Sequence, residues 1–499
     1  MSDRLKHLDW PQPSPLGPLW PVGEQPRREL IPPRSDAAEG DKLLATLDAV
    51  FDAFDIQDGA TLSFHHHYRN GDRLLNAVMA VAAARGLRDL TLAPSSLFPV
   101  HAPLVAYIRS GVVTRIVTDY VTGPVAGALE ALAVPLLLQT HGGRARAITT
   151  GHLRIDAAFV AAAQVSRTGD ATGRIGGNAC GPLGYAAVDA AHARRTVICA
   201  PEVTPLPPAL IDIPARNVDA VVRMDAVGDA AGIASATTLA AATPQARAVA
   251  ERVADVAEAA GVLRPGMALQ SGAGGYSLGA VPELGRRIGA KGICGSFISG
   301  GITAAHVALR RAGLFDRIED VQSFDPQAAQ SSGSDPRHRM MDAARYASVC
   351  HPAPVVDALS LMLLGAAQID AGFNVNVTTD ARGGVIGGPG GHPDAAEGAD
   401  LRIVTTGLTA AGQPKLVDKV RCVTTPGGRI DVLVTPEGVC VHPARADLAK
   451  DLRRAGIIPL AFGDLQRMGP DARAIPQNDP PHQARVLIED RHGGVLDWA

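Results

Sequence analysis

The most constraining feature of this sequence is a repeated change from short strand-like runs to longer runs with helical spacing. Thr61–Phe64 is followed by Leu74–Ala84, and Leu90–Ala93 is followed by Leu104–Ile108. Parallel strands cannot be joined by tight turns and need crossover connections, which are usually helices. The alternation continues through most of the chain. It therefore predicts an α/β fold whose mainly parallel sheets are covered by helices.

At 499 residues the chain is too long for one ordinary core. Residues 1–40 are rich in proline and charge, and we expect them to form an extended arm. Strands and helices alternate over residues 41–237, and a long alanine-rich helix is expected over 240–260. We therefore predict two tandem α/β domains, residues 41–237 and 238–499.

Charge and cysteine content exclude several classes of protein. The net charge is −3 and no basic block occurs, which argues against a nucleic-acid or membrane-surface partner. The six cysteines are scattered without a CxxC pair, so neither a disulfide framework nor a zinc site is predicted. No apolar leader and no uncharged apolar run of about 18 residues is present. We expect a soluble protein of the cytoplasm, where cysteines stay reduced.

A glycine-rich stretch, LQSGAGGYSLGAV at Leu269–Val281, interrupts an apolar run and leads into a helix-like segment. Gly272, Gly274 and Gly275 form the expected turn, and Leu278–Ile288 the expected helix. Bare backbone N–H groups at such a helix N-terminus stabilise a phosphate or a carbonyl oxygen that gathers negative charge. A plain tight turn would give the same pattern.

A second glycine loop, GGPGG, lies between the strand-like runs Phe373–Val377 and Leu401–Thr405. Its glycines are Gly387, Gly388, Gly390 and Gly391. One glycine loop in each half of the second domain would let two backbone segments face a single ligand. The two loops together are therefore a stronger indication of a binding site than either one alone.

Basic side chains follow two of the expected strands in the first domain. The segment SFHHHYRNGD at 63–72 places three adjacent histidines on extended backbone, where they point to alternating faces and cannot form one metal site. Arg69 offers a two-pronged donor for a carboxylate. HGGR at 141–144 adds a further cation, or else forms a hairpin turn before 145–149. We predict an anion-binding role for these groups, with structural packing as the alternative, and no metal.

The ordered set of motifs resembles the citrate lyase alpha subunit, the citrate CoA-transferase family. The motifs run in one order from about residue 40 to 455. More distantly, the scaffold is similar to the CoA-transferase superfamily, which is built from two related α/β domains. The residues that carry the resemblance are SFHHHYRNGD (63–72), HAPLVAYIRSGVVTRI (101–116), HGGRARAI (141–148), CGPLGYAAVDA (180–190), LQSGAGGYSLGAV (269–281), SGGITAAHV (299–307), DVQSFDPQAAQ (320–330), QIDAGFNVNV (368–377), GGPGGHPDAA (387–396) and DVLVTPEGV (431–439).

The resemblance implies a reaction and a set of partners. The expected reaction converts acetyl-S-acyl carrier protein and citrate into citryl-S-acyl carrier protein and acetate. The expected partners are a beta subunit, which cleaves the citryl thioester, and a gamma subunit, the acyl carrier protein. A CoA-like prosthetic group on that carrier supplies the thiol, so this chain is expected to hold no permanent cofactor. Alternatives are a citramalate lyase alpha subunit, another carboxylic-acid CoA-transferase, or a non-catalytic ligand-binding subunit.

The resemblance also bears on mechanism. CoA-transferases that use a glutamate place it about five residues before a glycine that here matches Gly301. In this chain that place falls at Ser296, and no glutamate lies between Glu283 and Glu319. A glutamyl-enzyme intermediate is therefore not expected. We predict instead a direct route, in which a citrate carboxylate attacks the acetyl thioester and an anhydride forms.

Roles for single residues follow from the resemblance. Backbone donors of Gly274 and Gly275 are expected to stabilise the oxyanion, and the Ser296 hydroxyl either binds citrate or fills space. The CoA-like group is expected along Gly272, Gly387, Gly388, Gly390 and Gly391. Citrate is a trianion near neutral pH, and its expected partners are His65, His66, His67, Arg69 and Arg144.

Overall fold

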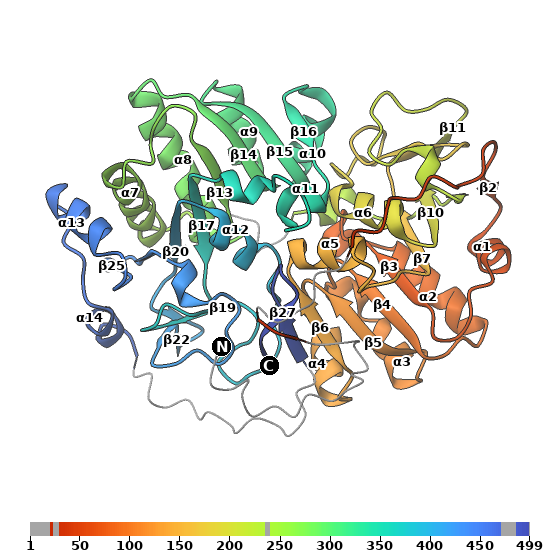
Figure 1. Ribbon diagram of the computed structural model, residues 1–499, viewed down its shortest axis with the longest axis horizontal. Helices are drawn as coiled ribbons and strands as arrows, with labels where there is room; N and C mark the ends of the chain where they lie inside the picture. Colours follow the sequence, from red (N-terminus) through yellow and green to blue (C-terminus); the bar gives the residue numbers. More distant parts are fainter. Residues whose placement is uncertain (1–19, 23–28, 235–239, 471–485, 499) are drawn as a thin grey trace.

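The computed structural model describes residues 20–22, 29–234, 240–470 and 486–498 of the chain, which form two α/β units side by side (Figure 1). Each unit has one large sheet, of eleven strands in the first and eight in the second within these ranges. Neighbouring strands are parallel except for one antiparallel pair near the edge of each sheet. The predicted α/β class with mainly parallel sheets is confirmed.

The first sheet runs across the red, orange and yellow part of the molecule in Figure 1 and includes dark blue strands from the end of the chain, among them β27. In spatial order its strands are β1 (Trp20–Pro21), β27 (Gly494–Trp498), β26 (Val486–Glu489), β6 (Leu136–Gln139), β5 (Val113–Thr118), β4 (Leu90–Pro94), β3 (Thr61–Phe64), β7 (Ala157–Ala161), β10 (Arg195–Ala200), β12 (Ala220–Arg223) and β2 (Leu43–Leu44). A small sheet holds β11 (Glu202–Thr204), β8 (Gln164–Ser166) and β9 (Ala171–Thr172). The helices of this unit are α1 (Leu47–Phe54), α2 (Leu74–Ala84), α3 (Leu104–Arg109), α4 (Pro124–Ala131), α5 (His141–Thr149) and α6 (Gly184–His192).

The second sheet lies in the green and blue part. In spatial order its strands are β16 (His338–Met340), β15 (Phe315–Ser323), β14 (Gly295–Ile302), β13 (Ala268–Ser271), β17 (Leu361–Gly365), β20 (Leu401–Thr405), β24 (Val432–Val434) and β25 (Val439–Val441). Short strands beside it are β19 (Val375–Asn376), β18 (Gln368–Asp370), β23 (Leu416–Val417), β21 (Thr409–Ala410) and β22 (Gln413–Pro414). Its helices are α7 (Pro244–Ala259), α8 (Gly275–Ala290), α9 (Ala304–Arg311), α10 (Pro326–Ser334), α11 (Ala343–Ala347), α12 (His392–Gly398), α13 (Ala446–Arg454) and α14 (Phe462–Arg467).

The first helix of the second unit, α7, shows how the sequence determines where a helix begins and which face it buries. The Thr243 side chain caps the helix, and Pro244 occupies the first turn, where its missing N–H costs nothing. Val249, Val253 and Val256 recur every three to four residues and are fully buried. This apolar stripe packs the helix onto the core beneath it.

The HGGR segment departs from the sequence-based expectation. It does not form a hairpin turn, because it begins α5. The Thr140 hydroxyl accepts the Gly143 N–H (2.9 Å) and caps the helix. The sequence did not predict this helix because two glycines, which lower helix propensity, lie in its first turn. Their role is close packing: a Cβ on Gly142 would lie 2.3 Å from the Ala347 carbonyl oxygen of α11.

The two units share a hydrophobic core. Ile148 of α5 and Tyr185 of α6, both from the first unit, belong to the same buried cluster as Val321, Tyr346 and Ala347 of the second. The helices α5 and α6 contact α11 directly. The packing between the units is therefore continuous with their interiors, and it fixes how the two sheets face each other.

The last strands of the chain return to the first sheet. We predicted that residues 238–499 form the second domain, yet β26 pairs with β6 in parallel and covers its edge. Glu489 of β26 accepts hydrogen bonds from Arg146 (2.8 Å) and Gln139 (3.0 Å). Asp497 of β27 accepts the Val423 N–H from the second unit (2.8 Å). β6 pairs with β5 on one side, and its other edge is thus covered by a strand distant in the sequence.

The predicted boundaries lie partly beyond the described residues. The junction at 237/238 falls within 235–239, and the predicted arm, 1–40, includes 1–19 and 23–28, all outside the described ranges. The described part of the arm follows the first unit: Trp20 pairs with Gly494, and the Arg34 guanidinium bonds Asp219 (2.9 Å). The two-domain division at 237/238 stays a prediction.

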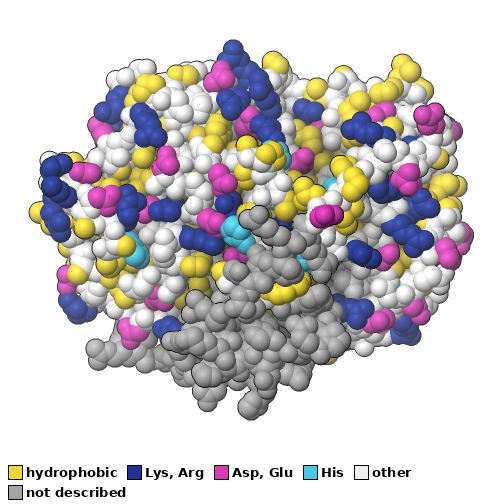
Figure 2. All heavy atoms as spheres, in the orientation of Figure 1, with side chains coloured by type: hydrophobic (Ala, Val, Ile, Leu, Met, Phe, Trp, Pro, Cys, Tyr) yellow, Lys and Arg dark blue, Asp and Glu magenta, His cyan; other side chains and the backbone are white. Residues whose placement is uncertain are grey.

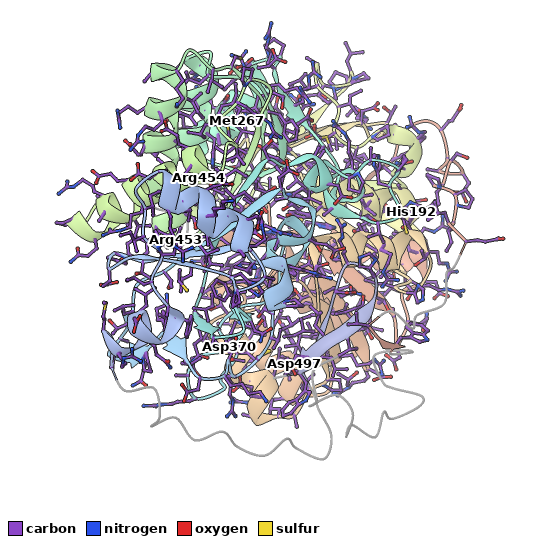
Figure 3. The ribbon with its side chains drawn as sticks, turned by 60° about the vertical axis from the view of Figure 1, so that its left-hand side comes forward. His192, Met267, Asp370, Arg453, Arg454 and Asp497 are labelled. Atoms are coloured by element: carbon purple, nitrogen blue, oxygen red, sulfur yellow. The ribbon has the colours of Figure 1, made fainter. Side chains whose placement is uncertain are left out.

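On the face visible in Figure 2, basic side chains are interspersed with acidic ones, as the near-neutral net charge indicates. Arg453 and Arg454 project from α13 at the surface (Figure 3). Among the described helices, none is long and apolar enough to cross a membrane.

The Arg146–Glu489 pair generates a prediction. Both side chains are about 6% exposed, so Glu489→Ala leaves a buried guanidinium without its carboxylate. We expect the change to destabilise the protein by about 3–5 kcal/mol, seen as a lower urea midpoint of unfolding. The control Asp451→Ala removes a surface partner of Arg454 and should cost less than about 1 kcal/mol. Equal midpoints for the two variants would show that the C-terminal strands do not stabilise the first sheet.

Candidate active site

A cavity of about 350 Å³ lies where the carboxyl ends of strands from both sheets meet. In open α/β sheets, ligands bind beyond the carboxyl ends of parallel strands. From the first sheet, the cavity wall includes residues that follow β4, β5 and β6, namely Ser96, Tyr120 and His141. From the second sheet it includes residues at the ends of β13, β14 and β17, namely Ser271, Gly301 and Gly365.

The first glycine loop forms one wall of the cavity. As predicted, a strand (β13) leads through Gly272 and Gly274 into a long helix, α8. Gly272 donates its N–H to the Leu363 carbonyl (2.7 Å), which ties the turn to β17. Gly274 occupies the N-cap position and supplies no side-chain cap. In the described part of the chain, the N–H groups of Gly274 and Gly275 have no hydrogen-bond partner and remain open to an anion.

The second glycine loop forms the facing wall. Gly388, Gly390 and Gly391 line the cavity, whereas Gly387 lies outside its wall, against the Val377 carbonyl. His141 donates its backbone N–H to the Gly390 carbonyl (2.9 Å), and Gly390 donates to the Asp119 carbonyl (3.2 Å). A Cβ on Gly388 would lie 2.4 Å from the same Asp119 oxygen. Glycine is required here because the loop touches the first unit backbone to backbone.

Two of the predicted cations reach the cavity. The Arg69 guanidinium lies between the rings of Phe98 (5.0 Å) and Phe324 (4.8 Å), one from each unit. Burial lowers the pKa of Arg69 to about 10, so the group stays charged at neutral pH. His66 also lines the cavity, with Nδ1 2.6 Å from the Ser95 hydroxyl. Burial lowers the pKa of His66 well below its ordinary value, which makes it a neutral hydrogen-bonding group.

The other predicted cations lie outside the cavity wall. Arg144 makes a two-pronged ion pair with buried Asp189 (2.6 and 2.7 Å), and His65 lies 3.2 Å from the same carboxylate. His67 is buried beside His65, and its ring nitrogens have no partner among the described residues. None of these three side chains belongs to the cavity wall, so the structure gives them no direct contact with an acid bound there. The Asp189 carboxylate accepts hydrogen bonds from both Ser63 and Arg144, so the charge of Arg144 is already neutralised within the protein.

Ser296, predicted either to bind citrate or to fill space, lies outside the cavity wall. It lies near the start of β14, and its N–H and Oγ both donate to the Met267 carbonyl (2.7 and 3.2 Å). The cavity is at the opposite end of that strand, at Gly301. Of the two alternatives for the Ser296 hydroxyl, the geometry favours the structural one.

Sequence reasoning missed a histidine–aspartate pair. His141 lines the cavity, and its Nδ1 lies 2.8 Å from Asp119 Oδ2. Asp119 is fully buried, and burial raises its pKa. The rings of Tyr185 (4.6 Å) and Tyr346 (6.3 Å) flank the imidazole. Their positions in the sequence could have indicated the pair, because Asp119 and His141 each come just after a strand that ends at the cavity.

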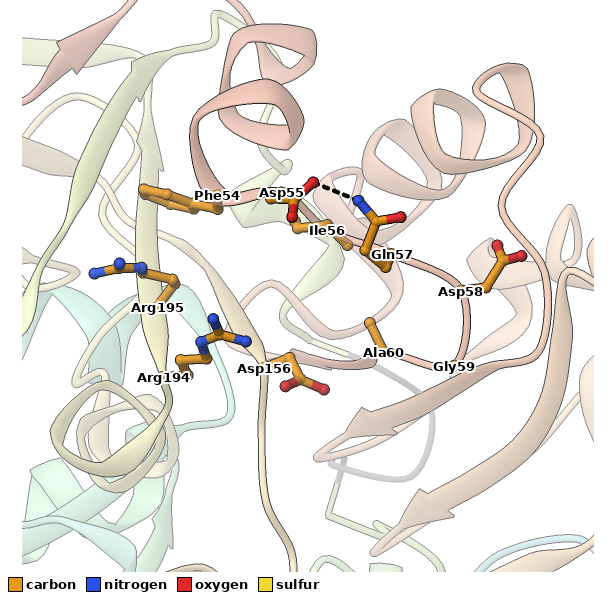
Figure 4. A pocket seen from close by; sticks show the side chains of 10 residues that line it. All are labelled: Phe54, Asp55, Ile56, Gln57, Asp58, Gly59, Ala60, Asp156, Arg194 and Arg195. Atoms are coloured by element: carbon orange, nitrogen blue, oxygen red, sulfur yellow. Dashed lines mark hydrogen bonds between the residues drawn. The ribbon is translucent and has the colours of Figure 1, made fainter.

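A second hollow, of about 260 Å³, lies at the opposite edge of the first sheet (Figure 4). Asp156 and Arg194 line it just before β7 and β10, and residues 54–60 close it. Gln57 donates to Asp55 across its rim. It contains none of the predicted site residues. Among the described residues, no cluster of His, Cys, Asp or Glu side chains is suited to hold a metal ion.

Comparisons with known proteins agree with this geometry. The model of the family described as citrate lyase, alpha subunit, matches residues 40–499. The citrate lyase alpha chain of Escherichia coli (strain K12) is 41% identical over 470 residues, covering 93% of this chain and 92% of the relative. The Klebsiella pneumoniae citrate lyase alpha chain is 38% identical over 459 residues, covering 91% and 90%.

Solved structures extend the comparison to the fold. An alpha subunit of citrate lyase from Streptococcus mutans, in complex with citrate, has a TM-score of 0.90 at 35% identity, covering 96% of this chain and 95% of that one. A Pseudomonas malonate decarboxylase hetero-tetramer includes a chain with the same fold, at a TM-score of 0.64 and 17% identity, covering 86% and 87%. The expected class of enzyme, a citrate lyase component with transferase activity, is confirmed. The chain belongs to the citrate lyase alpha-subunit family.

Proposed function

We propose that this chain exchanges acyl groups on a carrier thioester, converting acetyl-S-acyl carrier protein and citrate into citryl-S-acyl carrier protein and acetate. Family membership and the citrate complex of the Streptococcus mutans relative support citrate as the acid. The partners are a beta subunit that cleaves the citryl thioester and a gamma subunit that carries the CoA-like group. The cavity opens to solvent between two glycine loops, which suits the entry of a thioester on a long flexible arm. A cytoplasmic location stays a prediction.

One observation carries the proposed mechanism. Among the described residues that line the cavity there is no aspartate, glutamate or cysteine. The wall therefore lacks a carboxylate or thiolate that could take up the acyl group. Glu319, at the level of Ser299 on the neighbouring strand, pairs instead with Arg317 (2.7 Å) and Arg345 (3.0 Å). We therefore assign the role of nucleophile to the substrate's own carboxylate.

The direct route balances without a proton donor. A citrate carboxylate oxygen attacks the acetyl carbonyl carbon, and the tetrahedral oxyanion collapses by breaking the C–S bond. This releases the thiolate and forms an acetyl–citryl anhydride. The thiolate then attacks the citryl carbonyl carbon, and acetate departs with the C–O electron pair. Thiolate and carboxylate are both stable anions at neutral pH, so positioning and charge stabilisation are the main requirements.

Charge in the cavity suits these anions. Arg69 presents a guanidinium held by two aromatic rings, and a carboxylate can accept two of its N–H groups. His141, whose Nδ1 is held by Asp119, also lines the cavity and can offer its other ring nitrogen to a ligand. The open N–H groups of Gly274 and Gly275 at the start of α8 are placed to stabilise an oxyanion.

The direct route predicts the form of the kinetics. Both substrates must be bound before any product leaves. Double-reciprocal plots of the initial rate against citrate, at several fixed concentrations of acetyl thioester, should therefore give intersecting lines. Mass spectrometry after incubation with acetyl-coenzyme A alone should detect no covalent adduct on the chain. Parallel lines together with an adduct on a carboxylate side chain would contradict the proposed route.

Gly274→Val tests the first glycine loop. A Cβ at this position would find 3.5 Å to the Ser277 hydroxyl and 3.6 Å to Gly365 Cα, so the fold should accommodate it. The added methyl groups would cover the open N–H groups. We expect kcat to fall by about 100-fold or more, with an unchanged thermal unfolding midpoint. Gly274→Ala serves as the milder control, and full activity of the valine variant would exclude this loop from the chemistry.

Arg69→Ala tests the acid subsite. Loss of the charged donor should raise the KM for citrate by about tenfold or more, while the KM for the acetyl thioester stays unchanged. Arg115→Ala is the matched control, because that arginine lies on β5 of the same sheet and bonds Thr91 away from the cavity. An unaltered citrate requirement in the Arg69 variant would refute the assignment.

A further inference from the structure

We propose that the Ser271 hydroxyl is a third donor to the reacting oxyanion, beside the backbone of Gly274 and Gly275, and that buried His306 fixes its direction. The inference rests on the proposed transfer reaction and assigns new roles within the same cavity. It follows from a short hydrogen-bonded chain that runs from the backbone of Thr303 through His306 to Ser271.

The first link of the chain fixes the tautomer of His306. The Thr303 N–H donates to His306 Nδ1 (3.1 Å), so this nitrogen must be an acceptor and carries no proton. His306 is fully buried, and burial lowers its pKa to about 4, which keeps the ring neutral at physiological pH. A neutral imidazole has one N–H group. That hydrogen is therefore on Nε2.

The second link fixes the hydroxyl. His306 Nε2 lies 2.9 Å from Ser271 Oγ, and since Nε2 carries the hydrogen, it donates and the serine oxygen accepts. The Ser271 hydrogen must then point away from His306. Among the described residues the Ser271 side chain has no other hydrogen-bond partner, and the residue lines the cavity at the end of β13. The hydroxyl thus offers its hydrogen to a ligand.

The same chain argues against a nucleophilic serine. For His306 to remove the Ser271 proton, Nε2 would have to accept it, which requires the hydrogen on Nδ1. There the Thr303 hydroxyl, 3.1 Å away, could accept it, but the Thr303 N–H would lose its acceptor and point at a second donor. His306 is therefore a positioning residue and Ser271 a donor. Ser271 precedes Gly272 directly, so its hydroxyl and the α8 N-terminus converge on one side of the cavity.

The experiment uses the full chain with acetyl-coenzyme A and citrate, measuring acetate release. Ser271→Ala should lower kcat by about 100- to 1000-fold and leave the citrate dissociation constant from calorimetry unchanged. His306→Asn keeps an acceptor for the Thr303 N–H but is too short to reach Ser271, and should lower kcat by a smaller factor. In the Ser271→Ala background, His306→Asn should have no further effect on kcat.

Controls separate this result from a loss of structure. Ser277→Ala removes another buried hydroxyl, which bonds Thr405 of β20 and lies outside the cavity wall, and should retain wild-type kcat. Wild-type kcat in Ser271→Ala would overturn the donor role. Equal effects of His306→Asn in both backgrounds would overturn the positioning role, and an acetyl group found on Ser271 would replace both with a nucleophile. Failure of the wild-type chain to release acetate would instead refute the proposed function itself.

Discussion

The site depends on backbone-to-backbone contact between the two units. Gly142 of α5 meets the Ala347 carbonyl, and Gly388 meets the Asp119 carbonyl, at separations that leave no room for a side chain. Two parallel sheets would otherwise present two separate ligand edges. Because glycine permits this approach, the carboxyl ends of both sheets open into one cavity. The reacting groups of the proposed chemistry can then be held from two sides at once.

The cavity combines fixed charge with open backbone donors, and it lacks an acidic wall residue in the described part of the chain. Arg69 stays charged between two aromatic rings, whereas His66 and His306 are kept neutral by burial. These histidines therefore act through hydrogen bonds rather than through charge. Such a site suits reactions in which the substrates supply both the nucleophile and the leaving group.

Sequence periodicity predicted most of the fold. β3 and α2 have the predicted bounds, and the strand–loop–helix at Gly272–Gly275 is as expected, because local pattern and burial agree there. The hairpin at HGGR was wrong because glycines needed for packing against α11 imitate turn glycines. Residues 486–498 were assigned to the second domain, but their strands join the sheet of the first unit. Pairing between strands some 350 residues apart leaves no local pattern in the sequence from which it could be predicted.

For the site, the sequence by itself determined the chemistry on offer: two glycine loops, a cluster of basic residues after strands, and no glutamate where a covalent mechanism would need one. Only the tertiary structure decided which groups meet a ligand. Arg144 and Arg69 are both arginines near strand ends, yet Asp189 neutralises one while the other faces the cavity. The reason is physical: a buried charge takes its role from the partner that folding brings to it, and that partner can lie anywhere in the chain.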